Sequence, residues 1–226
     1  MIVIDIETVP CQWAGIRDEY AAAVKAPASY SKPESIQKWL EENRQAEGEA
    51  AWLKTSFDGG MGQIVCIGWA IDDNKPESLH TANLSPENEA EVLREFFAAM
   101  RFHHDNAGRR PPLVGHNIVA FDLPFVWKRS VVHGIKPPVW WPRDPKPWGE
   151  TVYDTMTQWA GVKERISLDK LCRVLGVGGK TGGPTGADVW PMVQAGRIKE
   201  VAEYCRHDVE ITRACYRRMT FSGVTA

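Results

Sequence analysis

The first ten residues, MIVIDIETVP, constrain the fold more than any other segment of the chain. Their apolar residues predict a buried β-strand over residues 1–8, yet Asp5 and Glu7 interrupt the apolar pattern. Side chains two positions apart project from the same face of a strand, so we expect these carboxylates to lie side by side. Two like charges on a half-buried surface are costly unless a positive charge joins them. The segment therefore belongs either to a solvated sheet edge or to a site that binds a cation.

The rest of the chain alternates between strand and helix patterns. Apolar segments bounded by turn residues predict strands over 64–72, 77–83, 111–117 and 151–155. Capping residues and helical apolar spacing predict helices over 85–104, 122–133, 155–161, 167–175, 188–195 and 197–220. This alternation indicates an α/β fold in one domain over 1–226, with a mixed central β-sheet and helices on both of its faces.

Two long segments have no simple place in this alternation. Residues 11–61 form an insertion between the first two strands, with a predicted helix at about 33–54. The insertion either packs on the core or forms a flap beside the acidic strand, because loops of this length are often functional. The segment 136–150 is rich in proline and tryptophan. Its tryptophans either pack this loop onto the core, which we favour, or stack on nucleic-acid bases.

Charge, cysteine content and hydropathy narrow the class of protein. The net charge of −2 and the pI near 6.3 argue against a protein that coats nucleic acid, but not against one that captures a strand end in a small pocket. The five cysteines are scattered without paired spacing, so we expect reduced structural thiols and neither a zinc site nor a disulfide framework. Without a membrane-length apolar run or a signal-peptide pattern, we expect a cytoplasmic protein that does not contact membranes.

Two further motifs carry acids. In GHNIVAFD, Asn117 and Phe121 precede Asp122, which follows a predicted strand and begins a predicted helix. Helix capping alone would explain Asp122, whereas GHN at a strand end indicates a tight pocket rim. In EYCRHD, Tyr204 and Asp208 are four residues apart and project from one face of the last predicted helix. A solvated helix face would explain that pair taken alone.

In their order along the chain, D-x-E-T, N-x-x-x-F-D and Y-x-x-x-D resemble the motifs of the DEDD exonucleases. These are proofreading-type 3′–5′ exonucleases of the ribonuclease H-like fold. The tyrosine four residues before the last acid is similar to the DEDDy branch. The C-terminal segment, from LGVGG to DVEIT, is similar to the family related to the exonuclease domain of family B DNA polymerases. The resemblance covers most of the chain and is weakest over 11–61.

The resemblance implies a set of four metal ligands, which are Asp5, Glu7, Asp122 and Asp208. Four carboxylates in one buried site require cations, and an all-oxygen ligand set suits Mg²⁺ or Mn²⁺. Two such ions about 4 Å apart would stabilise the attacking and leaving oxygens of a phosphoryl displacement. The resemblance also implies that Tyr204 orients the attacking water. With an ordinary pKa of about 10, a tyrosine suits that role better than the role of a base.

Several residues are candidates for contacts with the substrate. The resemblance implies that the backbone around Glu7 and Thr8 meets the terminal sugar. Asn117, in the GHN segment that indicates a pocket rim, and Phe121 in the N-x-x-x-F-D motif are further candidates for substrate binding. The glycine-rich segment VLGVGGKTGG either brings Lys180 to a phosphate or is a plain surface loop. It is not a nucleotide-binding P-loop, because Val174 replaces the required glycine and the segment follows a helix.

Two more residues are weaker candidates for the site. His207 adjoins Asp208, but successive helical residues point about 100° apart, so we expect no catalytic role for it. Asp154, at the end of TVYD, is expected to lie near the site at most, because three motifs already supply four acids.

The sequence supports three hypotheses on function. The preferred one is a metal-dependent 3′–5′ exonuclease that acts on single-stranded DNA and releases nucleoside 5′-monophosphates. A 3′–5′ exoribonuclease would use the same acids and would differ by its recognition of the 2′-OH. A nucleic-acid-binding module without activity is disfavoured by the presence of all four acids. The expected partners are the 3′ ends of single-stranded DNA or RNA, and replication or repair proteins are not identified by the sequence.

Overall fold

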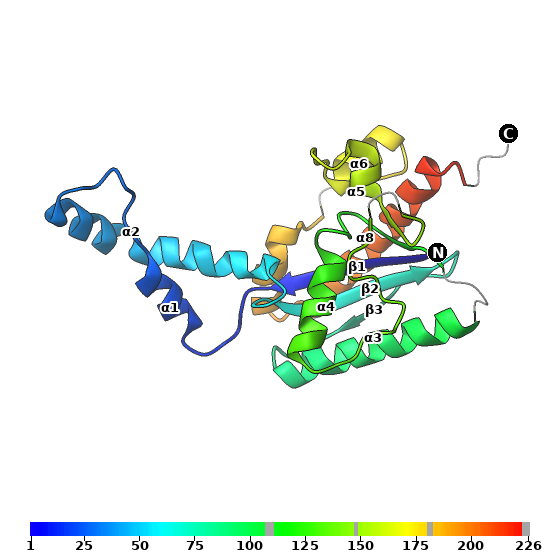
Figure 1. Cartoon of the computed structure of the whole chain (residues 1–226), viewed down its shortest axis with the longest axis horizontal. Coiled ribbons are helices and arrows are strands. Elements are labelled where there is room, and N and C mark those ends of the chain that lie inside the picture. The colour runs from blue at the N-terminus through cyan, green and yellow to red at the C-terminus, as the bar shows by residue number, and fades with distance from the viewer. Residues whose placement is uncertain (107–110, 147–148, 180–182, 223–226) are drawn as a thin grey trace.

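A five-stranded sheet forms the centre of the protein, for which the computed structural model describes residues 1–106, 111–146, 149–179 and 183–222 (Figure 1). The strand order is β3-β2-β1-β4-β5, with antiparallel pairing among β1, β2 and β3 and parallel pairing among β1, β4 and β5. This arrangement confirms the predicted mixed sheet of an α/β fold. The strands are β1 (Ile2–Val9), β2 (Gln63–Ile71), β3 (Glu77–His80), β4 (Leu113–Gly115) and β5 (Val152–Asp154).

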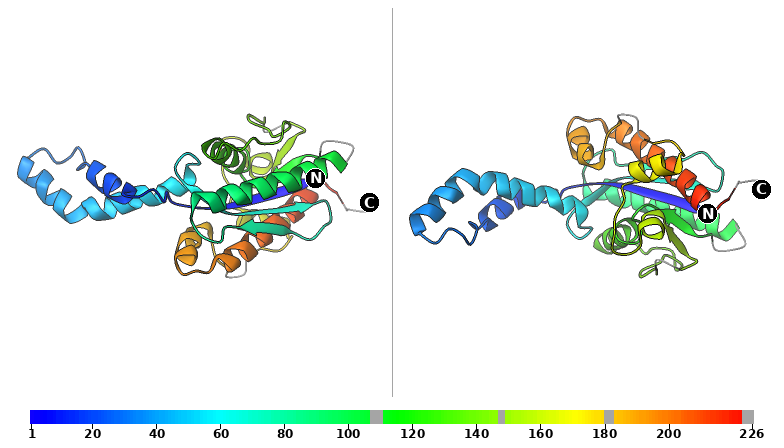
Figure 2. Two further views of the ribbon diagram at one scale, coloured as in Figure 1. Left: turned by 90° about the horizontal axis from the view of Figure 1, so that it is seen from below. Right: turned by 90° about the horizontal axis from the view of Figure 1, so that it is seen from above.

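Helices α3 (Pro86–Asn106) and α4 (Asp122–Val132) cover one face of the sheet, as the edge-on views of Figure 2 show. Pro86 occupies the first turn of α3, and the Ser85 hydroxyl accepts a 3.3 Å hydrogen bond from the backbone N–H of Asn88, as expected for a helix start. The apolar stripe of α3 and the apolar side of α4 pack on isoleucines of β1 and β2 in the largest core cluster. Burial of this apolar surface is the main stabilising contribution on this face.

A buried ionic network joins α3, α4 and β2. The Glu89 carboxylate is fully buried, accepts hydrogen bonds of 2.8 and 2.6 Å from Arg129, and also bonds to His133 and to the backbone N–H of Ile64. Burial alone would raise the pKa of Glu89, but the hydrogen bonds from His133 and Arg129 hold it below its ordinary value. The network fixes the position of α4 relative to the sheet, and therefore the position of the residue at its first turn.

The opposite face is covered by the long helix α8 (Ile198–Met219). Val209 of α8 packs with Val3 and Ala70 of the sheet, while Cys205 approaches Gly68 of β2. Shorter helices pack around α8, and their capping residues include Asp154 for α5 and Ser167 for α6. The helices in contact with α8 are α5 (Thr155–Ala160), α6 (Leu168–Leu175) and α7 (Val189–Gln194), and the 3₁₀ helix η2 (Gly186–Asp188) contacts α7.

The insertion between β1 and β2 forms a helical hairpin that projects away from the sheet (Figures 1 and 2). Its helices pack so closely that a Cβ atom on Gly48 would lie 2.5 Å from the Cα atom of Ala21. At its base, the buried Trp52 donates a 2.8 Å hydrogen bond to the carbonyl of Cys11. The elements of the insertion are α1 (Ile16–Ala23), α2 (Pro33–Leu53) and the short 3₁₀ helix η1 (Lys54–Phe57).

The predicted elements match the observed ones closely, except that α1 and the short 3₁₀ helices η1 and η2 were not predicted, and that β3 ends at His80 and not at residue 83. The strand predicted over 111–117 is observed as the shorter β4, which begins at Leu113 and ends at Gly115. In segment 136–150, Trp141 is buried against Phe96 and Phe97, so this tryptophan packs the loop onto the core as favoured. Within the part of the chain that the structure describes, no helix is long and apolar enough to cross a membrane.

Candidate active site

Asp5 and Glu7 lie on the face of β1 that α8 covers. Since β1 is the central strand, the alternative of a solvated sheet edge is wrong. Ile2, Ile4 and Ile6 alternate with the two acids and point into the core on the other face. Glu7 is only 7% exposed, so its carboxylate is held in a largely water-excluded position.

The pairing of β1 with β2 is irregular beside these acids. Glu7 pairs with Cys66, whereas the next residue, Thr8, pairs with Ile64, so that Val65 is an extra residue in β2. A bulge of this kind bends a strand and changes the direction of nearby side chains, and bulges are frequent next to active sites. Here it lies directly after the second acid of the strand.

The short strand β4 makes room for a third acid at the edge of β1. The partners of β4 in β1 are Ile2 and Val3, and the chain then turns away after Gly115, where a Cβ atom would lie 2.6 Å from the side chain of Ile118. Beyond that turn, Asp122 begins α4, and its Oδ1 accepts a 3.1 Å hydrogen bond from the backbone N–H of Ile6. Asp122 thus occupies the place beside β1 that a longer β4 would have filled.

Burial has a large effect on Asp122. Its side chain is 4% exposed, and burial together with the charge of Asp154 raises its pKa to about 7, although the hydrogen bond from Ile6 opposes the shift. A carboxyl with such a pKa is costly to ionise in the folded protein. A cation at this place would remove that cost.

Helix α8 brings the last two motif residues to the same region. Tyr204 is half-buried and Asp208 is 7% exposed, and both lie on the side of α8 that faces the sheet. Burial raises the pKa of Tyr204 well above its ordinary value, and the charges of Glu7, Asp208 and Asp5, together with a hydrogen bond to Asp208, raise it further. Tyr204 therefore keeps its proton and acts as a hydrogen-bond donor. Its surroundings show that acids from β1 and α8 share one site.

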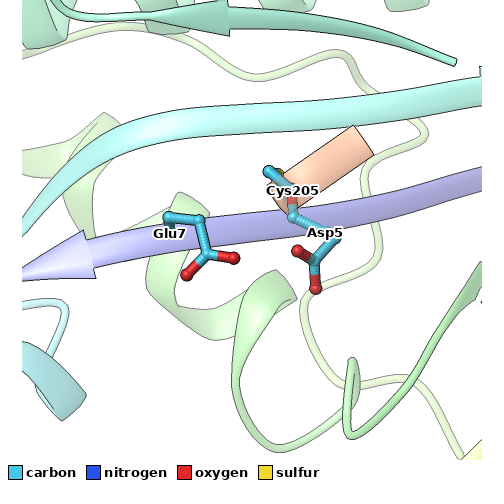
Figure 3. Close-up of side chains that lie close together, drawn as sticks. All are labelled: Asp5, Glu7 and Cys205. Carbon is cyan, nitrogen blue, oxygen red and sulfur yellow. The ribbon is translucent and has the colours of Figure 1, made fainter. Parts of the chain in front are cut away.

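Figure 3 shows the carboxylates of Asp5 and Glu7 on the same side of β1, with Cys205 of α8 beside the strand. One potential ligand atom from each of these three residues lies within 4.8 Å of the others. Cys205 was not anticipated, because nothing in its sequence context distinguishes it from a core thiol. Burial, the neighbouring Cys66 and the two carboxylates raise the pKa of the Cys205 thiol, so it remains protonated and is a poor metal ligand.

The donor chemistry fits a hard divalent cation. Buried carboxylates lie on β1, α4 and α8. Those of Glu7, Asp208 and Asp5 raise the pKa of Tyr204, whereas burial and the charge of Asp154 raise the pKa of Asp122. All-oxygen donors suit Mg²⁺ or Mn²⁺ rather than softer ions. Of the four predicted ligands, Asp5 and Glu7 lie in one compact group of potential donor atoms, which does not include Asp122 and Asp208. Asp122 adjoins β1 through the backbone N–H of Ile6, and Asp208 lies beside Tyr204, so both stay candidates for the same cation site.

Asp154 has a different role from these acids. Its fully buried carboxylate accepts hydrogen bonds from the backbone N–H groups of Asn117 and Val119, at 2.9 and 3.1 Å, and from those of Met156 and Thr157 at the start of α5. It therefore caps a helix and fixes the loop that leads to α4. Its place near the site agrees with the expectation, and its hydrogen bonds explain why it is there.

The predicted substrate contacts are placed as follows. Asn117 begins the loop before α4 in a left-handed conformation, with φ of 64°, and its Oδ1 is buried with no hydrogen-bond partner among the described residues. Phe121 precedes Asp122, and its ring lies 5.4 Å from that of Phe125. The Thr8 hydroxyl donates a 2.7 Å hydrogen bond to the carbonyl of Ser56 in η1. Lys180 lies outside the described residues.

A cleft of about 710 Å³ opens beside Tyr204, between α7 and α8. Its lining includes Met192, Arg197 and His207. Tyr204 lines it too, whereas the four motif acids do not. The exposed side chain of His207 belongs to this cleft and not to the buried face that carries Asp208. His207 and Asp208 thus point in different directions from α8, as expected for successive helical residues, and the expectation of no catalytic role for His207 stays a prediction.

Comparisons with known proteins agree with this architecture. A solved structure of the family B DNA polymerase from the hyperthermophilic archaeon Pyrobaculum calidifontis is similar over 97% of this chain, with a TM-score of 0.59 and 15% identity. The chain spans about a quarter of that polymerase, since 24% of its length is covered. At this identity the similarity shows the fold, which is the ribonuclease H-like fold of a polymerase exonuclease domain. None of the curated proteins matches the chain in sequence.

The family is shown by the sequence itself. Residues 57–224 match the model of a family described as a predicted 3′–5′ exonuclease related to the exonuclease domain of PolB. Because the match covers most of the chain, this protein belongs to that family. The matched residues include Asp122, Tyr204 and Asp208, whereas Asp5 and Glu7 precede them and are joined to them by the fold.

Proposed function

We propose that this protein is a metal-dependent 3′–5′ exonuclease that removes nucleotides from single-stranded DNA and releases nucleoside 5′-monophosphates. The observation that carries the proposal is the convergence of Asp5, Glu7 and Asp208 around Tyr204, with the buried Asp122 on the adjacent edge of β1. Membership of a predicted exonuclease family supports the same reaction.

The acids, the tyrosine and the residues around them would have different roles in phosphodiester hydrolysis. Asp5, Glu7, Asp122 and Asp208 would hold two divalent ions, Mg²⁺ or Mn²⁺, which when bound supply positive charge to the attacking and leaving oxygens. Tyr204 keeps its proton and would donate a hydrogen bond that orients the attacking water. Thr8, Asn117 and Phe121 lie around the acids and would contact the terminal nucleotide.

Two alternatives remain as outcomes of the test. An exoribonuclease would use the same carboxylates and would recognise the 2′-OH in addition. A binding module without activity would retain affinity for nucleic acid without hydrolysis. The concentration of buried acids favours an enzyme, because a binding module has no need to bury like charges at such a cost.

The test uses 5′-labelled DNA and RNA oligonucleotides with Mg²⁺ or Mn²⁺. We expect a ladder that shortens from the 3′ end, on DNA more than on RNA, and that EDTA and Asp5→Ala both abolish. Asp144→Ala is the matched control, because the Asp144 side chain is 86% exposed and pairs only locally with Lys146. If only RNA is shortened to a ladder, the protein is an exoribonuclease and not a DNA exonuclease. Wild-type protein that cuts neither polymer with either metal would refute the enzymatic proposal.

A further inference from the structure

The last turn of the insertion returns to the candidate active site, although its two long helices project away from it. In η1, the carbonyl of Ser56 accepts the hydrogen bond from Thr8, which directly follows Glu7 in β1. The neighbouring Thr55 is buried, and its hydroxyl accepts a 2.8 Å hydrogen bond from the backbone N–H of Cys11. The backbone of η1 is therefore held against the strand that carries two of the four acids.

A second set of contacts holds the same turn to α4. Asp58, which follows η1, forms a 3.2 Å ion pair with Lys128. The backbone at Gly59 lies so close to α4 that an added Cβ atom would be 2.9 Å from the Cα atom of Phe125. Residues on both sides of Phe57 are thus fixed, one side to β1 and the other to α4.

Phe57 itself is presented to solvent from this rigid turn. Its side chain is 72% exposed, and its ring centroid lies 6.4 Å from that of Phe121 at an interplanar angle of 58°. Phe121 directly precedes Asp122, and Phe57 directly follows Ser56, whose carbonyl binds Thr8. The two rings therefore lie beside the candidate metal ligands. Exposure of so large an apolar ring contributes little to the stability of the fold.

We propose that Phe57 is a substrate-positioning residue, which stacks on a base at the 3′ end of the single-stranded substrate. This inference rests on the proposed exonuclease function. Base–aromatic stacking tolerates every base, as required of an enzyme that removes nucleotides in sequence, and each stacked base contributes about 1–3 kcal/mol, or roughly 5- to 150-fold in affinity. The exposed Lys54 in the same turn is a suitable cation for the adjoining phosphate.

The experiment separates stacking from hydrolysis. The probe is a short single-stranded DNA with 2-aminopurine as its 3′-terminal base and phosphorothioate linkages at its 3′ end, mixed with full-length protein and Mn²⁺. Stacking on an aromatic ring changes 2-aminopurine fluorescence, so the signal reports the contact without turnover. We expect Phe57→Ala to lose this signal and to weaken binding about 5- to 150-fold, and Phe57→Trp to restore both.

Phe102→Ala is the matched control, because Phe102 is also exposed, at 66%, but lies in α3 away from these turns. In cleavage of unmodified DNA, Phe57→Ala should raise KM more than it lowers kcat. Equal binding, fluorescence and KM in Phe57→Ala and wild type would overturn the inference while leaving the exonuclease proposal intact. Failure of the proposed function has a different signature, which is the absence of cleavage by the wild type.

Discussion

Replacement of Asp122 by asparagine should stabilise the metal-free protein at alkaline pH. Asparagine has nearly the same shape, and its Oδ1 can still accept the 3.1 Å hydrogen bond from Ile6. The substitution removes only the charge, which burial and Asp154 make unfavourable in the folded state. The folded-state pKa of about 7, against an ordinary 3.8, corresponds to about 4 kcal/mol at 1.36 kcal/mol per tenfold change in proton affinity.

The sign of the pH dependence follows from the raised pKa. Between about pH 4 and pH 7 the folded protein binds more protons at Asp122 than the unfolded chain, so the free energy of unfolding falls as pH rises through this window. Above pH 7 the full cost is present. The free energy of unfolding of Asp122→Asn does not fall in this way. Its excess over the wild-type value should therefore be near zero at acid pH and largest at about pH 8.

The assay is thermal unfolding in EDTA across this pH range. With about 2–4 °C in Tm per kcal/mol for a chain of this size, the variant should unfold several degrees above wild type at about pH 8. Mn²⁺ should raise the Tm of wild type more than that of Asp122→Asn, because the variant lacks one ligand charge. Asp154→Asn is a contrasting variant. At acid pH, where the Asp122 carboxyl is neutral in both proteins, it should lower Tm, since it replaces one of the two oxygens that accept hydrogen bonds from four backbone N–H groups. A lower Tm for Asp122→Asn than for wild type at pH 8 in EDTA would refute the reasoning.

Three other outcomes are expected. Arg129→Met should lower the free energy of unfolding by about 3–5 kcal/mol in urea denaturation, because it leaves the buried Glu89 carboxylate without its bidentate partner; a loss below about 1 kcal/mol would contradict this. Tyr204→Phe should slow DNA hydrolysis yet leave Mn²⁺ affinity in calorimetry nearly unchanged, and a large loss of affinity would show that its role is misassigned. Gly48→Leu should destabilise the hairpin by about 1–3 kcal/mol and speed its proteolysis, since the new side chain meets the backbone of Ala21; unchanged proteolysis would argue against this packing.

Much of the fold could be predicted because its signals are local. Apolar periodicity indicates β2 and α3, and turn residues separate them from their neighbours. The segment that forms α1, IRDEYAAA, is too short and too polar to be distinguished from a loop. The direction in which the hairpin projects depends on the contacts at its base, such as that between Trp52 and Cys11, which no local pattern encodes.

The candidate site was predictable to the extent that its residues are spaced by the periods of a strand or a helix. Asp5 with Glu7 and Tyr204 with Asp208 are such pairs. Spacing alone did not assign them to a site, however, and the roles of Asp122, Tyr204 and Asp208 came from the resemblance of the three motifs to those of the DEDD exonucleases. The position of Cys205 beside the acids of β1 depends on residues about 200 apart in sequence, as its contact with the carbonyl of Asp5 shows. Such proximity is a property of the tertiary structure. The same holds for Phe57, which looks in the sequence like an ordinary loop residue.

The short length of β4 determines how much of the central strand is accessible from the side. Only Ile2 and Val3 of β1 pair with β4, so the edge of β1 from Ile4 to Val9, roughly 20 Å at the rise of an extended strand, has no partner in β4. Along this edge Asp122 meets Ile6, and Ser56 of η1 meets Thr8. The length of this unpaired edge is set by the number of residues in β4 and in the turn that follows it. Additions or deletions after Gly115 would therefore change how much of the edge of β1 is left without a strand partner, while the carboxylates on that strand keep their places.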